Sequence, residues 1–256
     1  GTGGSSSYVI EGGDGNDYIV SGTVGQLGTD KPVLGTVSLA GGGSSYEIYG
    51  GDGDDRIELA PNPDSLATYH DAVKSLVFPE DSGSGAAPTG RGAYVVDAGP
   101  DDDTIVMTDH LYPGFSIEGG SGFDELVFAL PTFEGSTTGF IVDGVSPGRR
   151  PAEMFDGIEM ISLQTEGPLD FKLRLDEAVL REITPSGQLY ITEDQQLVSR
   201  SVELADGDEW ELTAEGISGP KGLSYNVYAK PEEDLEIVIA DSLDVSLIGS
   251  GGQDPA

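Results

Sequence analysis

The sequence predicts an all-β protein: a short parallel β-solenoid with insertions, followed by a β-rich region that is sandwich-like or caps the solenoid. Two observations lead to this prediction. A unit of the form Tyr-x-Ile-x-Gly-Gly-x-Gly-x-Asp-x-Ile occurs four times in the first half of the 256 residues. In the second half, from Phe171 to Leu247, apolar and polar residues alternate with the period of two that is typical of strands.

The four copies share one register. Each has an Asp at the sixth position and an aliphatic residue at the eighth; an aromatic residue stands four positions before each copy and an aliphatic residue two before. The copies are residues 12–20, 50–58, 98–106 and 119–127, with Tyr8, Tyr46, Tyr94 and Phe115 as the preceding aromatics. Four copies in register are stronger evidence than one Gly/Asp-rich surface turn.

Each copy has a direct physical interpretation. The glycines admit positive φ and a tight turn, and the aliphatic residues on either side belong to strands whose side chains point to one face. Stacked copies would align their turns and present carbonyl and carboxylate oxygens from two successive turns to one site. Such a set of oxygens suits calcium, whereas zinc prefers nitrogen and sulfur ligands.

The copies resemble the RTX, or haemolysin-type calcium-binding, repeat. In that family the sixth-position Asp and the carbonyls of the first and third turn residues bind Ca²⁺ between adjacent turns. The resemblance therefore implies carboxylate ligands at Asp17, Asp55, Asp103 and Asp124 and carbonyl ligands at Gly12, Asp14, Gly50, Asp52, Gly119 and Ser121.

The third copy departs from the family pattern. It has Ala98 at the first position, Pro100 at the third and Asp101 at the fourth. Pro100 has no N–H to donate, and Asp101 would be strained if its φ were positive. The calcium site of this copy is therefore expected to be weaker, unless the Asp101 carboxylate binds the ion directly.

The domain organisation follows from the spacing of the copies. Residues 1–130 are expected to form the calcium-binding solenoid, with insertions at about 21–45 and 60–93. The first insertion resembles an extra hairpin, and the second contains a helical pattern within residues 63–76 behind a Ser or Asp cap. Residues 131–150 form the predicted linker and 151–250 the β-rich capping domain.

Composition limits the partners. The formal net charge is -34, from 46 acidic and 12 basic residues, so nucleic acid and anionic membranes would be repelled. Divalent cations are the natural counter-charge. There is no cysteine, and no apolar run reaches the about 20 residues of a membrane-spanning helix. The chain opens with Gly1 and lacks a starting Met, which suggests a monomeric fragment of a longer protein.

The sequence does not indicate an enzyme. His70 and His110 are the only histidines and lack the spacing of paired metal ligands, and no nucleophile elbow, phosphate-binding loop or EF-hand pattern is present. Nothing selects two of the many carboxylates as a catalytic acid and base.

Residues 155–163, and the strand patterns that follow up to 239, resemble the block that follows calcium repeats in large bacterial surface adhesins. Together the two resemblances imply an extracellular, type I-secreted adhesin module that folds on binding calcium and supports adhesion or biofilm formation through a glycan or protein ligand. The alternatives are the non-catalytic RTX region of a secreted enzyme or toxin, and a calcium-dependent carbohydrate-binding module in which Trp210 or a tyrosine contacts the sugar.

Overall fold

The computed structural model describes a defined part of the chain. The described residues are 7–21, 35–37, 45–59, 94–107, 115–129, 140–142, 155–164, 171–175, 177–184, 186–193, 200–205 and 209–248. The predicted insertion at 60–93, with its helix, lies outside them, as does most of the one at 21–45. The chain divides into two compact units, residues 1–122 and 123–256, and each is described by itself.

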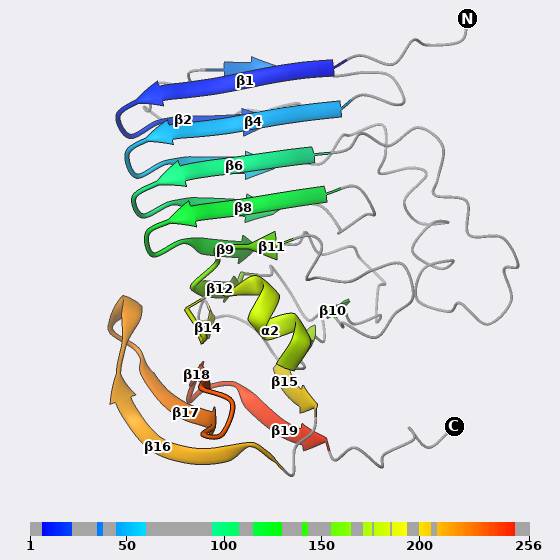
Figure 1. Cartoon of the computed structure of the whole chain (residues 1–256), viewed down its shortest axis with the longest axis vertical. Coiled ribbons are helices and arrows are strands. Elements are labelled where there is room, and N and C mark those ends of the chain that lie inside the picture. Colours follow the sequence, from blue (N-terminus) through cyan, green and yellow to red (C-terminus); the bar gives the residue numbers. More distant parts are fainter. Residues whose placement is uncertain are drawn as a thin grey trace, which may run out of the picture. The chain divides into compact units, whose positions relative to one another are not determined.

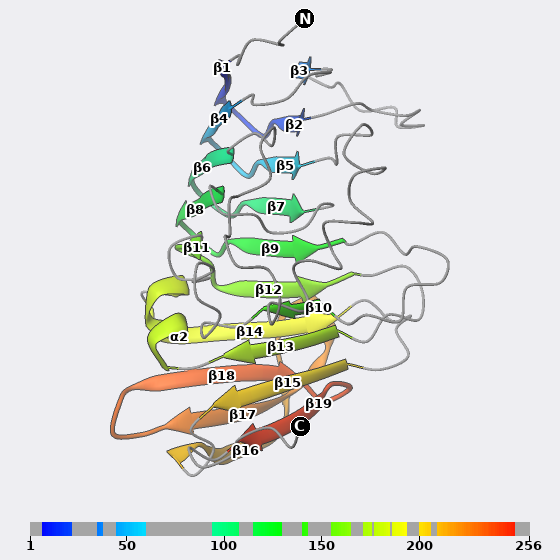
Figure 2. The same ribbon diagram turned by 90° about the vertical axis from the view of Figure 1, so that its right-hand side faces the viewer.

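The first unit contains two parallel arrays of strands. In one array the order is β1 (Ser7–Asp14), β4 (Ser45–Asp52), β6 (Tyr94–Pro100) and β8 (Phe115–Ser121). In the other it is β3 (Gly35–Val37), β2 (Tyr18–Ser21), β5 (Arg56–Leu59) and β7 (Thr104–Met107). Figure 1 shows the first array face on, and Figure 2 shows the second. Because β3 pairs in parallel with β2, these two strands do not form a hairpin.

The register predicted for the copies is confirmed. Tyr8 pairs with Tyr46, Tyr46 with Tyr94, and Tyr94 with Phe115. The aliphatic residues on either side of the turns are buried: Ile48, Val96 and Ile117 before them, and Ile19, Ile57 and Ile105 after them. Alternation of side chains along a strand places each such residue on the inner face, so equivalent positions form continuous apolar rows.

The second unit is also built mainly from parallel strands. One sheet runs through β9 (Glu125–Phe128), β12 (Met160–Leu163), β14 (Gln188–Glu193) and β18 (Leu235–Ala240) in parallel, then adds β17 (Ser224–Lys230) and β16 (Glu211–Ser218) antiparallel. The other contains β10 (Phe140–Val142), β13 (Phe171–Leu175), β15 (Arg200–Ala205) and β19 (Asp244–Ile248), all parallel. A short strand, β11, covers Phe155–Asp156. The prediction of an all-β protein is confirmed.

One element of the second unit was not predicted. Residues Glu177–Ile183 form a two-turn helix, α2, with Leu180 and Ile183 buried beneath it. Glu177 in its first turn and Arg181 in its last complement the helix dipole and form an ion pair at i,i+4. Within the described residues no helix is long and apolar enough to cross a membrane.

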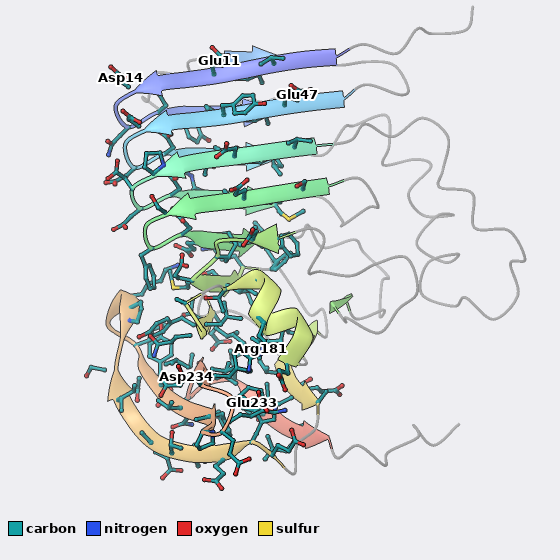
Figure 3. All side chains as sticks on the ribbon, viewed as in Figure 1. Glu11, Asp14, Glu47, Arg181, Glu233 and Asp234 are labelled. Atoms are coloured by element: carbon teal, nitrogen blue, oxygen red, sulfur yellow. The ribbon has the colours of Figure 1, made fainter. Side chains whose placement is uncertain are left out.

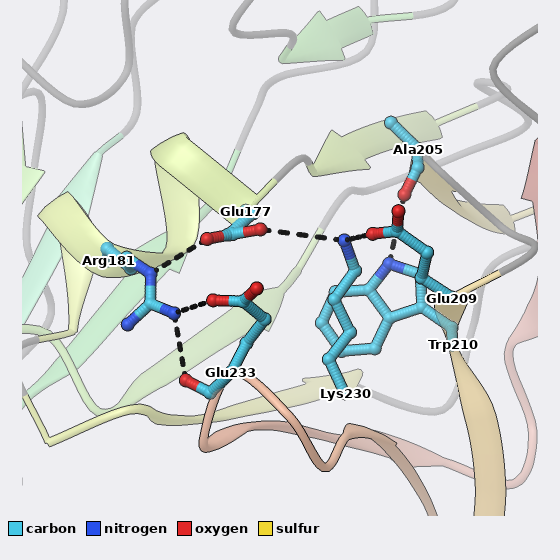
Figure 4. A network of polar contacts seen from close by, with 7 residues as sticks. All are labelled: Glu177, Arg181, Ala205, Glu209, Trp210, Lys230 and Glu233. Atoms are coloured by element: carbon cyan, nitrogen blue, oxygen red, sulfur yellow. Dashed lines mark hydrogen bonds and ion pairs between the residues drawn. The ribbon is translucent and has the colours of Figure 1, made fainter.

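A polar network stabilises the second unit around Lys230 (Figure 4). The Lys230 side chain is only 2% exposed, and its Nζ lies 2.7 Å from Glu209 Oε2 and 3.7 Å from Glu177 Oε2. The same Nζ lies 5.3 Å from the centre of the Trp210 ring, and Trp210 Nε1 donates a 2.9 Å hydrogen bond to the Ala205 carbonyl. One buried cation thus joins α2, β17 and the segment that leads into β16.

Lys230→Met is expected to lower the free energy of unfolding of the second unit by about 1–3 kcal/mol, because it removes two ion pairs and a cation–π contact. Methionine retains most of the packing volume. Arg181→Met is the control, since Arg181 is 44% exposed and exposed ion pairs contribute at most about 1 kcal/mol. Urea unfolding followed by the fluorescence of Trp210, the single tryptophan, measures both. If both variants lowered the free energy of unfolding by the same amount, a special role for the buried lysine would be contradicted.

Candidate metal centre

The candidate site lies at the turns that join the two arrays of the first unit. These turns follow β1, β4 and β6 and lead into β2, β5 and β7. Asp14, at the end of β1, marks the first of them in Figure 3. In each turn the second and fourth positions have positive φ. The values are 103° and 100° at Gly13 and Gly15, 106° and 118° at Gly51 and Gly53, and 111° and 82° at Gly99 and Asp101.

The third turn keeps this geometry despite its substitutions. Asp101 has a φ of 82°, so the strain expected at this position is present, and it costs about 1–2 kcal/mol for an L-residue. Its N–H donates a 2.8 Å hydrogen bond to the Ser121 carbonyl, just as Gly15 donates a 2.7 Å bond to the Asp52 carbonyl. The stack of turns is therefore continuous through residues 98–103.

Backbone groups fix the sixth-position carboxylates. Asp55 Oδ1 accepts a 2.8 Å hydrogen bond from the Asp17 N–H, and Asp103 Oδ1 accepts a 2.7 Å bond from the Asp55 N–H. The main chain of one turn thus orients the carboxylate of the next. Asp55 and Asp103 are each only 2% exposed, which is unusual for carboxylates.

The second carboxylate oxygens of these aspartates could bind a cation. Oδ2 of Asp17 and Oδ2 of Asp55 are buried and accept no hydrogen bond from any described residue. Burial raises the pKa of the Asp55 carboxyl, and the charges of Asp17 and Asp54 act in the same direction. A buried carboxylate oxygen without a partner carries a large desolvation cost, which a bound cation would remove.

The first-position glycines allow the close approach of the next turn beside these oxygens. A Cβ added at Gly12 would lie 2.2 Å from the Gly50 carbonyl oxygen and 2.8 Å from Asp17 Oδ2. A Cβ added at Gly50 would lie 2.1 Å from the Ala98 carbonyl oxygen and 2.4 Å from Asp55 Oδ2. Each glycine thus lies against a carboxylate oxygen of its own turn and a carbonyl oxygen of the next, and any side chain at either position would overlap both oxygens.

Carboxylate and carbonyl oxygens are the ligands that calcium takes in proteins. Asp17, Asp55 and the Gly50 carbonyl, all predicted ligands, come together in the first unit. The Ala98 carbonyl was not among the predicted ligands, because the prediction used only the carbonyls of copies that match the family pattern. No group of three or more His, Cys, Asp or Glu side chains that could hold a metal occurs among the described residues, and a site built largely from carbonyls would not form one.

Other predicted ligands lie elsewhere in the turns. Asp14, Asp52 and Asp101 have exposed side chains, and the third-position carbonyls of Asp52 and Ser121 accept the turn hydrogen bonds described above. Gly119 is buried in the first unit and Asp124 in the second, since the division of the chain falls within the fourth copy. His70 and His110 lie outside the described residues.

Sequence reasoning missed a fifth copy, in the second unit. Met160 and Ile161 pair with Glu125 and Leu126, the seventh and eighth residues of the fourth copy. Glu159 therefore occupies the sixth position, and its Oε2 accepts a 2.9 Å hydrogen bond from the Asp124 N–H, as the sixth-position aspartates of the first unit do. Gly157, two residues earlier, has a φ of 64° at the fourth position. The Gly-x-Glu-x-Ile pattern of residues 157–161 was the sequence signal that could have revealed this copy.

Trp210 does not provide an exposed sugar platform. It is 4% exposed and packs beneath Lys230. Comparisons of the chain with protein-family models, curated proteins and solved structures found no match, so a function has to be inferred from the residues themselves.

Proposed function

We propose that the chain is an extracellular calcium-binding module of a bacterial RTX adhesin, and that its first unit is a β-solenoid ordered by Ca²⁺ between successive turns. The observation that carries the proposal is the pair of buried oxygens without a hydrogen-bond donor, Asp17 Oδ2 and Asp55 Oδ2, each beside a glycine that brings a carbonyl oxygen of the next turn close to it. The repeat pattern of the sequence and the net charge of -34 support it.

Bound calcium would supply positive charge at the point where two turns meet. The residues of the chain do the rest: the Asp17 and Asp55 N–H groups orient the neighbouring carboxylates, and the Gly50 and Ala98 carbonyls face the carboxylate oxygens of the preceding turn. Each carboxylate oxygen and the carbonyl oxygen near it come from two different copies, so they come together only when the copies stack. Calcium binding and folding are therefore one equilibrium, and the chain would order after secretion into a calcium-rich medium.

Calorimetric titration of the chelator-treated chain with CaCl₂ tests the proposal. We expect saturable binding accompanied by a gain in β-type circular dichroism, because folding and binding are coupled. A chain that binds no calcium would refute the proposal. The alternative of a secreted enzyme or toxin predicts the same calcium binding for this region. The sugar-binding alternative cannot use Trp210 as a sugar contact, because that side chain is buried.

Asp55→Asn is expected to remove one calcium equivalent while stabilising the calcium-free protein. The amide keeps an acceptor for the Asp17 N–H and places a donor where Oδ2 now stands, near the Ala98 carbonyl. A new buried hydrogen bond and the loss of a buried charge should together raise calcium-free stability by about 1 kcal/mol or more.

Asp54→Asn is the matched control, because it makes the same change in net charge at an exposed neighbour in the same turn. Titration calorimetry and thermal melts in chelator measure the two effects for both variants. If Asp54→Asn lost as much calcium as Asp55→Asn, overall charge and not the buried oxygen would govern binding.

A further inference from the structure

Strand β19 in the second unit leaves one edge of its sheet open. It is the last strand of the parallel sheet that contains β10, β13 and β15, and it pairs with β15 along its whole length without a break in register. No described strand pairs with its other edge (Figure 2). The N–H and C=O groups along such an edge can pair with a further strand, so proteins usually shorten, bend or charge their edge strands.

Two other edge strands of the second unit are protected in these ways. β10, at the opposite end of the same sheet, has only three residues. β16, at the end of the other sheet, has two irregularities in its pairing with β17, one between Leu212 and Ala214 and one between Ala214 and Ile217. Bulges of this kind bend an edge strand and interrupt its hydrogen-bonding row. β19 lacks the protection that β10 and β16 have.

The apolar interior of the second unit reaches the surface at β19. Leu175 pairs with Leu204, and Leu204 pairs with Leu247, so the three leucines form one row across β13, β15 and β19. Leu175 and Leu204 are fully buried, whereas Leu247 is 47% exposed. Val245 belongs to the neighbouring row and is only half-buried. Because side chains alternate between the two faces of a strand, a further strand beside β19 would cover both residues.

The other sheet of the second unit shows how a parallel array can end. Its strands are parallel up to β18, and β17 then pairs with β18 in the antiparallel direction. No described strand of the chain does the same for β19. An antiparallel strand from a second copy of the chain would give this sheet the same kind of ending.

We propose that two copies of the chain associate through β19, which pairs antiparallel with its counterpart about a twofold axis at Ser246. In this register Val245 of one copy lies opposite Leu247 of the other, so the apolar rows of the two copies meet. Asp244, the one charged residue of the strand, lies opposite position 248 and not opposite its own counterpart. The strand is therefore complementary to itself, as a twofold interface requires. This dimer differs from the monomer expected from the sequence and does not rest on calcium binding.

Ser246→Cys tests the register directly, because the chain has no cysteine of its own. Directly opposed residues of an antiparallel pair have Cβ atoms about 5 Å apart, which a small adjustment brings within the range of a disulfide. We expect a disulfide-linked dimer under mild oxidation in saturating calcium. The assay uses about 0.5 M NaCl, since salt screens the repulsion between two acidic copies.

Asp244→Cys is the matched control on the same strand. The two copies of this residue would lie about 13 Å apart along the strands, beyond the reach of a disulfide, so we expect crosslinking at least about tenfold slower than in Ser246→Cys. The control is stringent, because the substitution also removes a charge that opposes association. Equal rates in the two variants would indicate random collision and overturn the proposal.

Leu247→Glu tests the same interface without a covalent bond. A single strand pair makes a small interface, so sedimentation equilibrium between about 10 µM and 1 mM covers the weak association expected of it. The wild-type chain should dimerise as its concentration rises, and Leu247→Glu should stay monomeric, because its carboxylate would face Val245 of the other copy. Leu212→Glu is the control, since Leu212 is also 47% exposed but lies on β16.

Circular dichroism and the fluorescence of Trp210 verify the fold of each variant. If Leu247→Glu fails to fold, the two cysteine variants still decide, because they change only exposed positions of β19. A wild-type chain that stays monomeric over the whole range, or a dimer that Leu247→Glu leaves intact, would overturn the proposal. Neither result would affect the proposed function, which concerns the first unit.

Discussion

Removal of calcium is expected to lower the melting temperature of the first unit by tens of degrees. At a Kd of about 10⁻⁴ M, as extracellular calcium modules have, about 10 mM calcium stabilises a folded state by about 2.7 kcal/mol per site. Two sites then contribute about 5 kcal/mol, a large part of the about 5–15 kcal/mol that a folded domain has. The negative charge of Asp17 raises the pKa of the Asp55 carboxyl, so the two carboxylates repel each other without the ion.

Thermal melts followed by circular dichroism, in calcium and in chelator, measure this effect. Magnesium at equal concentration is the control for ionic strength and charge, since Mg²⁺ demands near-ideal octahedral geometry and gives up its water reluctantly. Stabilisation by calcium alone would agree with a site of carbonyl and carboxylate oxygens. An identical melt in calcium and in chelator would contradict calcium-dependent folding, and equal stabilisation by both ions would indicate general screening of the acidic chain.

Gly51→Ala is expected to disrupt the first unit even in saturating calcium. A Cβ at this position would lie 2.1 Å from the Gly13 carbonyl oxygen, and Gly51 has a φ of 106°. The oxygen belongs to the backbone of the neighbouring strand, so the overlap can be relieved only by separating β1 from β4. The loss should exceed about 4 kcal/mol, a size reached when a substitution combines steric overlap with backbone strain.

Gly13→Ala is the matched control for this substitution. Gly13 occupies the same position in the first copy with a φ of 103°, but nothing lies within 4 Å of the added Cβ. Only the conformational strain remains there, at about 1–3 kcal/mol. Chemical unfolding in saturating calcium compares the two variants. If both variants lost the same free energy of unfolding, positive φ alone would account for the destabilisation, and the contact between turns would not be close.

The first unit was largely predictable from the sequence, because its constraints are local and repeated. Positive φ requires glycine at fixed positions, and an apolar residue must follow the turn, so Ile19, Ile57 and Ile105 could be aligned without knowledge of tertiary contacts. The Ala98 carbonyl could not be predicted in this way, since a backbone oxygen leaves no mark in the residue type that carries it.

The second unit was less predictable, because its elements depend on contacts between distant residues. Helix α2 has only two turns, and it is stabilised by the burial of Leu180 and Ile183 and by the pairing of Arg181 with Glu233, none of which a local pattern reveals. The fifth copy escaped detection because Glu159 replaces the aspartate. Its longer side chain still accepts the Asp124 N–H, so the hydrogen bond is retained although the residue differs.

The close contacts made by the second-position glycines run from each copy to the copy before it. The second-position glycines Gly51, Gly99 and Gly120 each face the carbonyl of the copy before them, within 2.3 Å of an added Cβ, whereas Gly13 faces open space. The steric room for a side chain there is thus set by the upstream neighbour, while the positive φ adds strain in every copy. A tandem duplication of one copy would need no compensating change downstream, since the next copy already carries its glycine. The array could therefore gain a whole copy without further change, whereas a side chain at any of these three glycines would force its strand away from the preceding one.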